Sequence, residues 1–446
     1  MSKSIVNGAI MAAGIAAITL GVEAEGQVVT ALALLWVIAY LWISEAFHIT
    51  ITALLIPLLA VATGLLDVKG ALANFAHPII FLFLGGFALA AAMHIQGLDR
   101  WLADSILRLT GGRLDRGVLL LALATALLSM WISNTAVTAM MLPLVLGLLS
   151  EKPDLPYATR AFSLLAIAYS ASIGGVGTLI GTPPNAIVAA ELGLSFVDWL
   201  YIGVPLVVVL WPLMMVVLAR VLRPDFQDAR LEVRVEAFAW TRERRVLLGI
   251  FTITVIGWLF GRPLSALLGV GDDMDTWVAL LALGLIAATG VARWQQIEKS
   301  TDWGVLLLFG GGLTLNGLLK SSGASEFLGL GLAGLIEGWG VVLVIMALVT
   351  FVVFFSEVTS NTATAALLVP LFVALPGDML DPTQAALAIG VAASTAFMLP
   401  VGTPPNALVH GTGMVRQQTM IRAGFVLNLV CIAVLTLVFS QFYGSP

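Results

Sequence analysis

Gly-Thr-Pro-Pro-Asn-Ala at residues 181–186 recurs without a change at residues 402–407. Each copy follows a Ser-Asn-Thr triplet, at 133–135 and at 360–362. A third match is a pair of glycines, Gly85-Gly86 and Gly310-Gly311. The three landmarks keep their order at offsets of 221 to 227 residues, and this agreement predicts an internal duplication of the chain.

The composition indicates a membrane protein. Of the 446 residues, 60% are apolar and 11% are charged, and the mean hydropathy is +1.03. An ordinary soluble domain carries about 25% charged residues. The net charge of -5 offers no basic surface for nucleic acid. A single cysteine and four scattered histidines provide neither a disulfide framework nor a metal cluster, and no nucleophile–base pair is evident, so an enzyme is not expected.

Eleven apolar stretches are long enough for a membrane span of about 20 residues. Two further apolar stretches, 117–150 and 342–375, hold the Ser-Asn-Thr triplets in their middle. Each is predicted to be a re-entrant hairpin that enters and leaves the membrane on one side. The eleven predicted spans are 6–22, 28–45, 49–66, 78–95, 159–180, 199–222, 246–261, 276–293, 303–319, 385–401 and 423–443.

The positive-inside rule supports this layout, with a cytoplasmic N-terminus and an external C-terminus. The predicted inside loops and adjoining span ends hold 18 of the 21 basic residues, Arg230 and Arg234 among them, and no basic residue is placed in the interior of a span. Reading either hairpin as a full crossing would remove this asymmetry. The first apolar stretch is expected to remain as a span, since no cleavage site follows it. The three basic residues of the outside loops are Lys69, Arg262 and Lys320.

An odd number of crossings separates equivalent points of the two copies, so they are predicted to be inverted repeats, an architecture of secondary transporters. Unpaired backbone in hydrocarbon costs several kcal/mol per group, and four matched breaks therefore predict a shared polar cavity. Helix N-termini at these breaks would offer N–H groups and partial positive charge to an anion. We expect unusual dihedral angles at Gly181 and Gly402, N-cap positions at Thr182 and Thr403, and first helical turns at Pro183 and Pro404.

Neutral oxygens near the same breaks suit a hard cation such as Na+. They come from the hydroxyl of Ser129 or Ser356, from the asparagine side chains, and from carbonyls freed at Gly181 or Gly402. Two cation sites would supply positive charge that no basic residue in a span provides. For Glu357 we expect a structural role as partner of loop backbone, because its counterpart in the other copy is Met130. Glu191 is expected to face water near a span end.

The paired motifs resemble those of the divalent anion/Na+ symporter family, whose bacterial dicarboxylate members are the most similar. The resemblance covers essentially the whole chain. It implies a homodimer of eleven-span subunits in a bacterial inner membrane, working by an elevator mechanism. A scaffold domain would comprise residues 1–112 and 225–340, and a moving transport domain residues 113–224 and 341–446. Amphipathic stretches near 98–112 and 322–338 would be interfacial helices that link the two domains.

The same resemblance implies which residues bind. One Na+ site would use Ser129, Ser133, Asn134 and Gly181. The other would use Ser356, Ser360, Asn361 and Gly402. The substrate carboxylates would meet Asn134, Thr135, Asn361 and Thr362, with Thr182, Thr403 and Pro404 nearby.

The expected function is Na+-coupled import of C4-dicarboxylates such as succinate, malate or fumarate, with the substrate, Na+ and the lipid bilayer as partners. A Na+-independent dicarboxylate exchanger on the same fold stays open, because neutral oxygens alone do not prove coupling. Citrate or sulfate as substrate also stays open, because the sequence does not measure the pocket. A proton-driven antiporter normally needs a carboxylate or lysine in mid-membrane, and none is placed at the breaks. An anion channel would keep the helix termini without alternating access.

Overall fold

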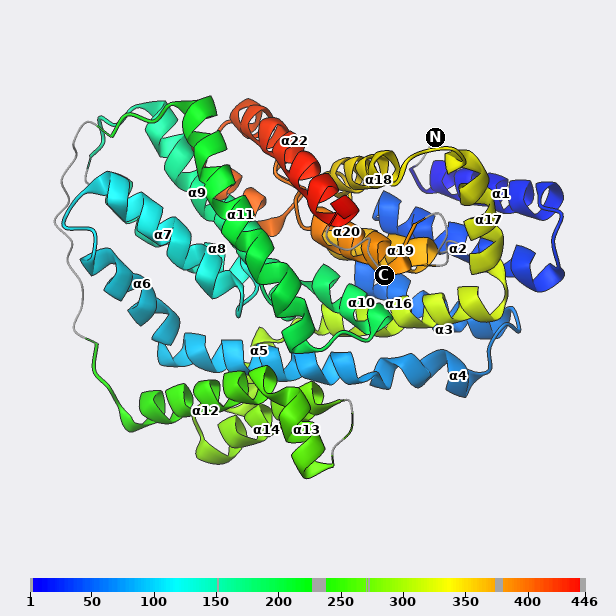
Figure 1. The fold of residues 1–446 in the computed structure, drawn as a ribbon, viewed down its shortest axis with the longest axis horizontal. Helices are drawn as coiled ribbons and strands as arrows, with labels where there is room; N and C mark the ends of the chain where they lie inside the picture. Colours follow the sequence, from blue (N-terminus) through cyan, green and yellow to red (C-terminus); the bar gives the residue numbers. More distant parts are fainter. Residues whose placement is uncertain are drawn as a thin grey trace.

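The computed structural model describes residues 3–150, 152–226, 238–269, 271, 273–373 and 380–441. Every regular element among these residues is a helix (Figure 1). Five of the described helices are long and apolar enough to cross a membrane, or up to seven if each bent pair is one span. The prediction of an all-helical multi-pass protein is confirmed, and the number of eleven spans stays a prediction. Arg230 and Arg234 lie outside the described residues.

The helices of the first half fall into two groups along the chain. The first group is α1 Lys3–Gly21, α2 Gly26–Ser44, α3 Ile49–Ala62, α4 Val68–Ala73, the short 3-10 helix η1 Asn74–Ala76, α5 Pro78–Gln96 and α6 Leu98–Arg108. The second group is α7 Leu114–Ser129, α8 Asn134–Ser150, α9 Tyr157–Gly175, α10 Pro183–Leu192 and α11 Phe196–Leu222.

The second half contains two comparable groups. The first is α12 Arg242–Leu259, α13 Gly261–Leu268, α14 Met274–Thr289, α15 Trp294–Ser300, α16 Trp303–Ser321 and α17 Ala324–Ile336. The other is α18 Val341–Ser356, α19 Asn361–Val373, α20 Pro382–Ala393, α21 Pro404–Gly411 and α22 Gln417–Gln441.

The glycine pairs bring helices into close contact. Helices α5 and α16 both have 19 residues and carry Gly85 and Gly311 at buried positions. A β-carbon at Gly85 would lie 2.4 Å from the carbonyl oxygen of Ala279 in α14, and one at Gly311 would lie 2.6 Å from that of Ala53 in α3. Helix α5 therefore packs closely on α14, as α16 packs on α3. Small residues permit such approaches between membrane helices.

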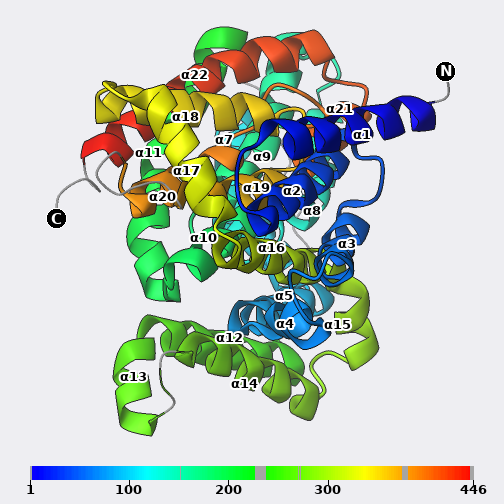
Figure 2. The same ribbon diagram turned by 90° about the vertical axis from the view of Figure 1, so that its right-hand side faces the viewer.

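The hairpins and broken helices of the two copies form one body. Helices α7 and α8 pack against α9, and α18 and α19 pack against α20. The copies also interlock, because α10 packs against α19 and α20, whereas α21 packs against α8 and α9. One apolar core contains residues from all of these segments, including Ile132, Val188, Val353 and Phe397. Both views place α12, α13 and α14 on the opposite side of α5 from α9 and α22 (Figure 2).

Several predicted boundaries are wrong near the breaks. The stretch 159–180 was expected to be one span, but α9 ends at Gly175, and for the stretch 385–401 the helix α20 ends at Ala393. The released backbone groups find partners in nearby side chains, described below, so the helices can end inside the bundle. Arg160 and Arg220 lie in the end turns of α9 and α11 rather than in loops. Charged side chains at such ends can still reach water.

Candidate binding site at the helix breaks

The first hairpin brings most of the first predicted cation set together. The Ser129 hydroxyl is fully buried and lies 2.6 Å from Asn134 Oδ1 and 2.7 Å from the carbonyl oxygen of Ala171. A β-carbon at Gly175 would lie 2.5 Å from the same Asn134 oxygen, and one at Gly181 would lie 2.4 Å from the carbonyl oxygen of Gly175. Oxygens from α7, α8 and α9 thus converge on one small region next to Gly181.

The hairpin tips carry their polar groups differently. Ser133 is exposed just before α8, and its Oγ accepts a hydrogen bond from the amide of Ala136 at 3.4 Å, as expected of an N-cap. At the other tip the amide of Thr364 donates to the carbonyl of Ser360 at 2.9 Å. Asn361 Oδ1 is buried and has no hydrogen-bond partner within the described part of the chain. A buried carbonyl oxygen without a donor is suited to a cation.

Glu357 lies beside Gly402, one member of the second predicted cation set. Ser356 is fully buried, and its hydroxyl donates to the carbonyl of Val353 at 3.0 Å. A β-carbon at Gly402 would lie 3.0 Å from Glu357 Oε2 and 3.4 Å from the Glu357 carbonyl oxygen. Among the described residues no hydrogen bond joins Asn361 or Ser360 to Gly402. Glu357, which follows Ser356 in the chain, is therefore the residue in contact with Gly402.

Glu357 itself is only 3% exposed and holds the break that follows α20. Its Oε1 accepts from the amides of Phe397 (2.7 Å) and Met398 (2.8 Å) and from the Asn428 side chain (2.8 Å), while Oε2 accepts from the amide of Leu399 (2.9 Å). The expectation that Glu357 is a partner of loop backbone is confirmed. Such bonds compensate the peptide groups that the broken helix releases.

The glycines of the repeated hexapeptide are needed for space rather than for unusual dihedral angles. Neither Gly181 nor Gly402 has a positive φ, so that expectation was wrong. A β-carbon at Gly181 would lie 2.4 Å from the carbonyl oxygen of Gly175, which leaves no room for a side chain. At Gly402 the contact would be tight but less severe, 3.0 Å from Glu357 Oε2 and 3.3 Å from the carbonyl oxygen of Leu399. Thr182 and Thr403 do occupy N-cap positions, and a proline begins each helix. The side-chain cap forms only at Thr403, whose Oγ1 accepts from the amide of Asn406 at 3.3 Å.

No role was predicted from the sequence for the asparagines of the hexapeptides, Asn185 and Asn406, although their duplication could have indicated one. Asn185 is fully buried, and its Nδ2 donates to the carbonyls of Gly175 (2.9 Å) and Thr178 (2.7 Å). In the second copy Asn406 Nδ2 donates to the equivalent carbonyls, those of Ala396 (3.3 Å) and Leu399 (3.1 Å). Each asparagine therefore closes the break that precedes its own helix.

A cavity of about 860 Å³ reaches the first hairpin tip and the first break. Ser133, Thr135, Gly181 and Pro183 line it, as do aromatic residues of α5 and residues 300–303 before and at the start of α16. The helices α8 and α10 both begin at this cavity, so their N-termini face the same space. Of the predicted substrate residues only Thr135 lines this cavity. Those that do not line it are Asn134 and Thr182 of the first copy and Asn361, Thr362, Thr403 and Pro404 of the second. Helix α19 packs against α16 instead.

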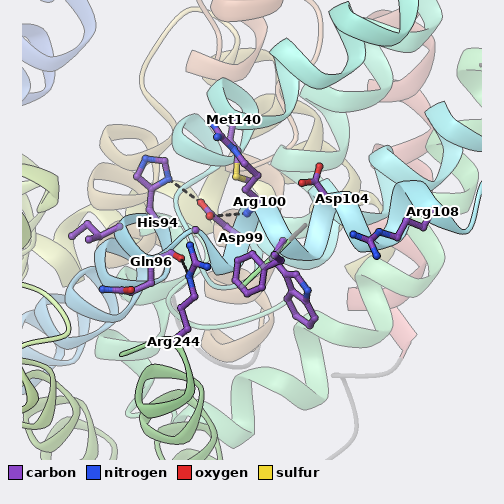
Figure 3. A pocket seen from close by; sticks show the side chains of 12 residues that line it. His94, Gln96, Asp99, Arg100, Asp104, Arg108, Met140 and Arg244 are labelled. Carbon is purple, nitrogen blue, oxygen red and sulfur yellow. Dashed lines mark hydrogen bonds and ion pairs between the residues drawn. The ribbon is translucent and has the colours of Figure 1, made fainter. Parts of the chain in front are cut away.

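The mouth of the cavity is charged. Asp99, Arg100, His94 and Met140 line it and also border a second cavity of about 350 Å³ (Figure 3). Asp99, in the amphipathic helix α6, is 3% exposed and pairs with His94 Nδ1 at 2.8 Å. Arg100 gives the cavity a basic side chain from outside the predicted spans, whereas the sequence had placed none near the site.

Two carboxylates of the broken-helix region are paired with basic residues of other helices. The Glu191 side chain, at the end of α10, is 4% exposed and accepts from Asn316 Nδ2 and Lys320 Nζ of α16. The expectation that Glu191 faces water was wrong. Asp198, in α11, forms an ion pair at 2.8 Å with Arg262 of α13. Lys320 and Arg262 are two of the three basic residues that the charge distribution assigns to the outside.

Comparison with known proteins places this arrangement in a family. The model of the citrate transporter family CitMHS matches residues 39–379. The chain belongs to this family. An uncharacterized transporter of Haemophilus influenzae is 50% identical and covers 92% of this chain and 91% of its own length. The sodium-dependent dicarboxylate transporter SdcS of Staphylococcus saprophyticus is 36% identical and covers 91% of this chain and 84% of its own.

A solved structure supports the fold alone. The YdaH transporter of Alcanivorax borkumensis has a TM-score of 0.55 at 14% identity, and the match covers 84% of this chain and 87% of that one.

The resemblance to the divalent anion/Na+ symporter family is confirmed by the matches to SdcS and to the citrate transporters. This member of the citrate transporter family is therefore a transporter with a polytopic helical fold.

Proposed function

We propose that the protein is a Na+-coupled importer of C4-dicarboxylates such as succinate, malate and fumarate. The observation that carries this proposal is the common cavity at the first hairpin tip and the first break, where two helix N-termini meet neutral hydroxyl groups. Helix N-termini favour anions through their free N–H groups and dipoles. The 36% identity to a sodium-dependent dicarboxylate transporter supports the cation and the substrate class.

Substrate would be held by Asn134 and Thr135 at one tip and by Asn361 and Thr362 at the other. Thr182, Thr403 and Pro404 would lie nearby. The first Na+ would use Ser129, Ser133, Asn134 and Gly181, and the second Ser356, Ser360, Asn361 and Gly402. Coupling follows from charge, because a dianion binds well only after cations have brought positive charge into a weakly solvated region.

The transport cycle would move residues 113–224 and 341–446 against a scaffold of residues 1–112 and 225–340. The interlocked packing of α8 with α21 and of α10 with α19 supports a single moving body. The open cavity adjoins Arg100 and Asp302, near loops that the positive-inside rule assigns to the cytoplasm. The space between α10 and α16 is almost closed, about 10 Å³. We therefore assign this conformation to the inward-facing state.

Homodimerisation, an N-terminus in the cytoplasm, an external C-terminus and a bacterial inner membrane belong to the same proposal and rest on the resemblance and the charge distribution. Citrate is the second candidate substrate, because the family model that matches this chain is that of citrate transporters. A Na+-independent exchanger would use the same anion site without cation coupling.

Uptake of radiolabelled succinate into proteoliposomes, with and without an inward Na+ gradient, tests the proposal. We expect accumulation against a gradient only with Na+, and stronger competition from malate than from citrate or sulfate. Succinate counterflow that is equally fast without Na+ would replace the symporter by the exchanger. Citrate accumulation without succinate uptake would change the substrate. The Asn134→Ala variant, reconstituted in parallel, serves as the inactive control.

A further inference from the structure

The two predicted cation sets are not equivalent, although the sequence repeats them. In the second set the carboxylate of Glu357 borders Gly402, and its Oε2 lies 3.0 Å from the position of a β-carbon there. The matching residue of the first set is Met130, an uncharged side chain. Its carbonyl accepts a hydrogen bond from the Thr178 hydroxyl, and its side chain packs towards Gly177. A negative charge therefore stands beside one set only.

The hydrogen bonds of Glu357 keep that charge in place. Its four hydrogen-bond partners among the described residues are all N–H donors, three on Oε1 and one on Oε2. These donors are neutral, so they place no positive charge beside the carboxylate. Oε2, the oxygen nearer Gly402, carries the smaller number of donors. It retains acceptor capacity beside Gly402.

The asparagine side chains of the two sets also differ in their hydrogen bonding, and the difference again favours a cation at the second set. Asn134 Oδ1 is occupied, because the Ser129 hydroxyl lies 2.6 Å from it. Asn361 Oδ1 is buried without a partner in the described residues, and the Ser356 hydroxyl bonds to Val353 of its own helix instead. A cation at the first set meets an oxygen that already accepts a hydrogen bond, whereas one at the second set meets an oxygen without a donor in the described residues.

We propose that the second set, Ser356, Ser360, Asn361 and Gly402, is the tighter Na+ site and fills first, with Glu357 as the positioning residue that supplies its negative charge. This inference rests on the proposed function, which assigns Na+ to both sets. The unequal charge gives the cations an order of binding. The second Na+ and then the dianion enter a region that the first Na+ has already neutralised.

The decisive comparison is between Glu357→Gln and Asn428→Ala. The first variant removes the charge with little change of shape. The second removes one hydrogen bond to the same carboxylate and leaves the charge. The readout is the midpoint of thermal unfolding of the purified full-length protein, without substrate, as Na+ replaces choline at constant ionic strength. Ligand that binds only the folded state raises this midpoint, so the curve reports Na+ affinity without any transport.

We expect Glu357→Gln to raise the half-saturating Na+ concentration of the first binding phase by about tenfold or more, as the loss of a nearby charge at low effective dielectric constant requires. Asn428→Ala should keep the wild-type concentration even where its baseline midpoint is lower. An unchanged Na+ curve in Glu357→Gln would overturn the inference. An equal shift in Asn428→Ala would also overturn it, since Glu357 would then act only through loop geometry.

A second pair of variants keeps the inference testable if Glu357→Gln does not fold. Ser356→Ala should raise the half-saturating Na+ concentration of the first phase, and Ser129→Ala should affect only the second phase. The reverse order would overturn the inference. The same measurement also tests the proposed function, and a failure of that function gives a different result. If Na+ fails to stabilise the wild type at all, Na+ coupling itself fails, whereas stabilisation of the wild type with equal curves in all variants removes only the unequal sites.

Discussion

Replacing Lys320 by methionine should weaken the contact between α10 and α16 and favour the opposite state of the transporter. The Glu191 carboxylate is 4% exposed and has two partners, Lys320 and Asn316. Without Lys320 the charge would remain buried with one neutral donor. Stranding a buried charge costs about 3–5 kcal/mol. Lys320 is itself 49% exposed, and exposed pairs contribute about 0–1 kcal/mol. Because Lys320 is about half-exposed, we expect its removal to cost an amount between these two limits, about 2 kcal/mol.

In a two-state equilibrium this cost changes the ratio of the states about 30-fold. Ala186 provides the probe, because it is fully buried and lines the small space between α10 and α16. A cysteine there can react only when the two helices separate. Cys431, the native cysteine, is buried and gives little background. When separation is rare, the labelling rate follows the population of the separated state, so Lys320→Met should label about 30-fold faster with an impermeant maleimide.

Two controls make the result specific. Lys69→Met removes an exposed lysine of α4, on the same predicted face, and should leave the labelling rate unchanged. Adding Glu191→Gln to Lys320→Met removes the stranded charge and should bring the rate back to within about fivefold of the parent. Labelling in Lys320→Met no faster than in Lys69→Met would refute the view that this ion pair holds the inward-facing state.

Three further outcomes are expected. Asn185→Ala should lower the free energy of unfolding by about 2–4 kcal/mol, because two buried carbonyls lose their donor, and Asn406→Ala, whose bonds are longer, should lose less; denaturant titration that gives the opposite order contradicts this account. Asn134→Ala should abolish Na+-dependent succinate uptake while circular dichroism shows an unchanged helix content, and retained uptake would reject the site. Gly175→Ala would place a β-carbon 2.5 Å from Asn134 Oδ1 and should raise the half-saturating Na+ concentration at least tenfold in the unfolding assay; Gly147→Ala, where nothing lies within 4 Å, should not, and an equal effect in both would count against the crowding argument.

Local features of the sequence were sufficient for the class of protein and for the repeat. Low charge and long apolar stretches require a membrane environment, since no soluble fold could cover so much apolar surface. The duplicated triplets and hexapeptides marked the helix breaks, because Pro, Gly and N-capping residues act on their own backbone within a few positions. The amphipathic segment 98–112 also proved helical, as α6.

Contacts between distant segments were beyond such reasoning. Glu357 binds amides about forty residues away, Glu191 meets a lysine of the other half of the chain, and Asp99 turns inward to His94. In the sequence, a carboxylate within an apolar segment gives the same pattern whether it binds backbone, a cation or water. Only its neighbours in the folded structure show which of these it binds. The sequence already places Glu357 in one copy and Met130 in the other, but only the tertiary structure shows that the Glu357 carboxylate lies beside Gly402 and binds the backbone after α20, because these segments meet only in the folded chain.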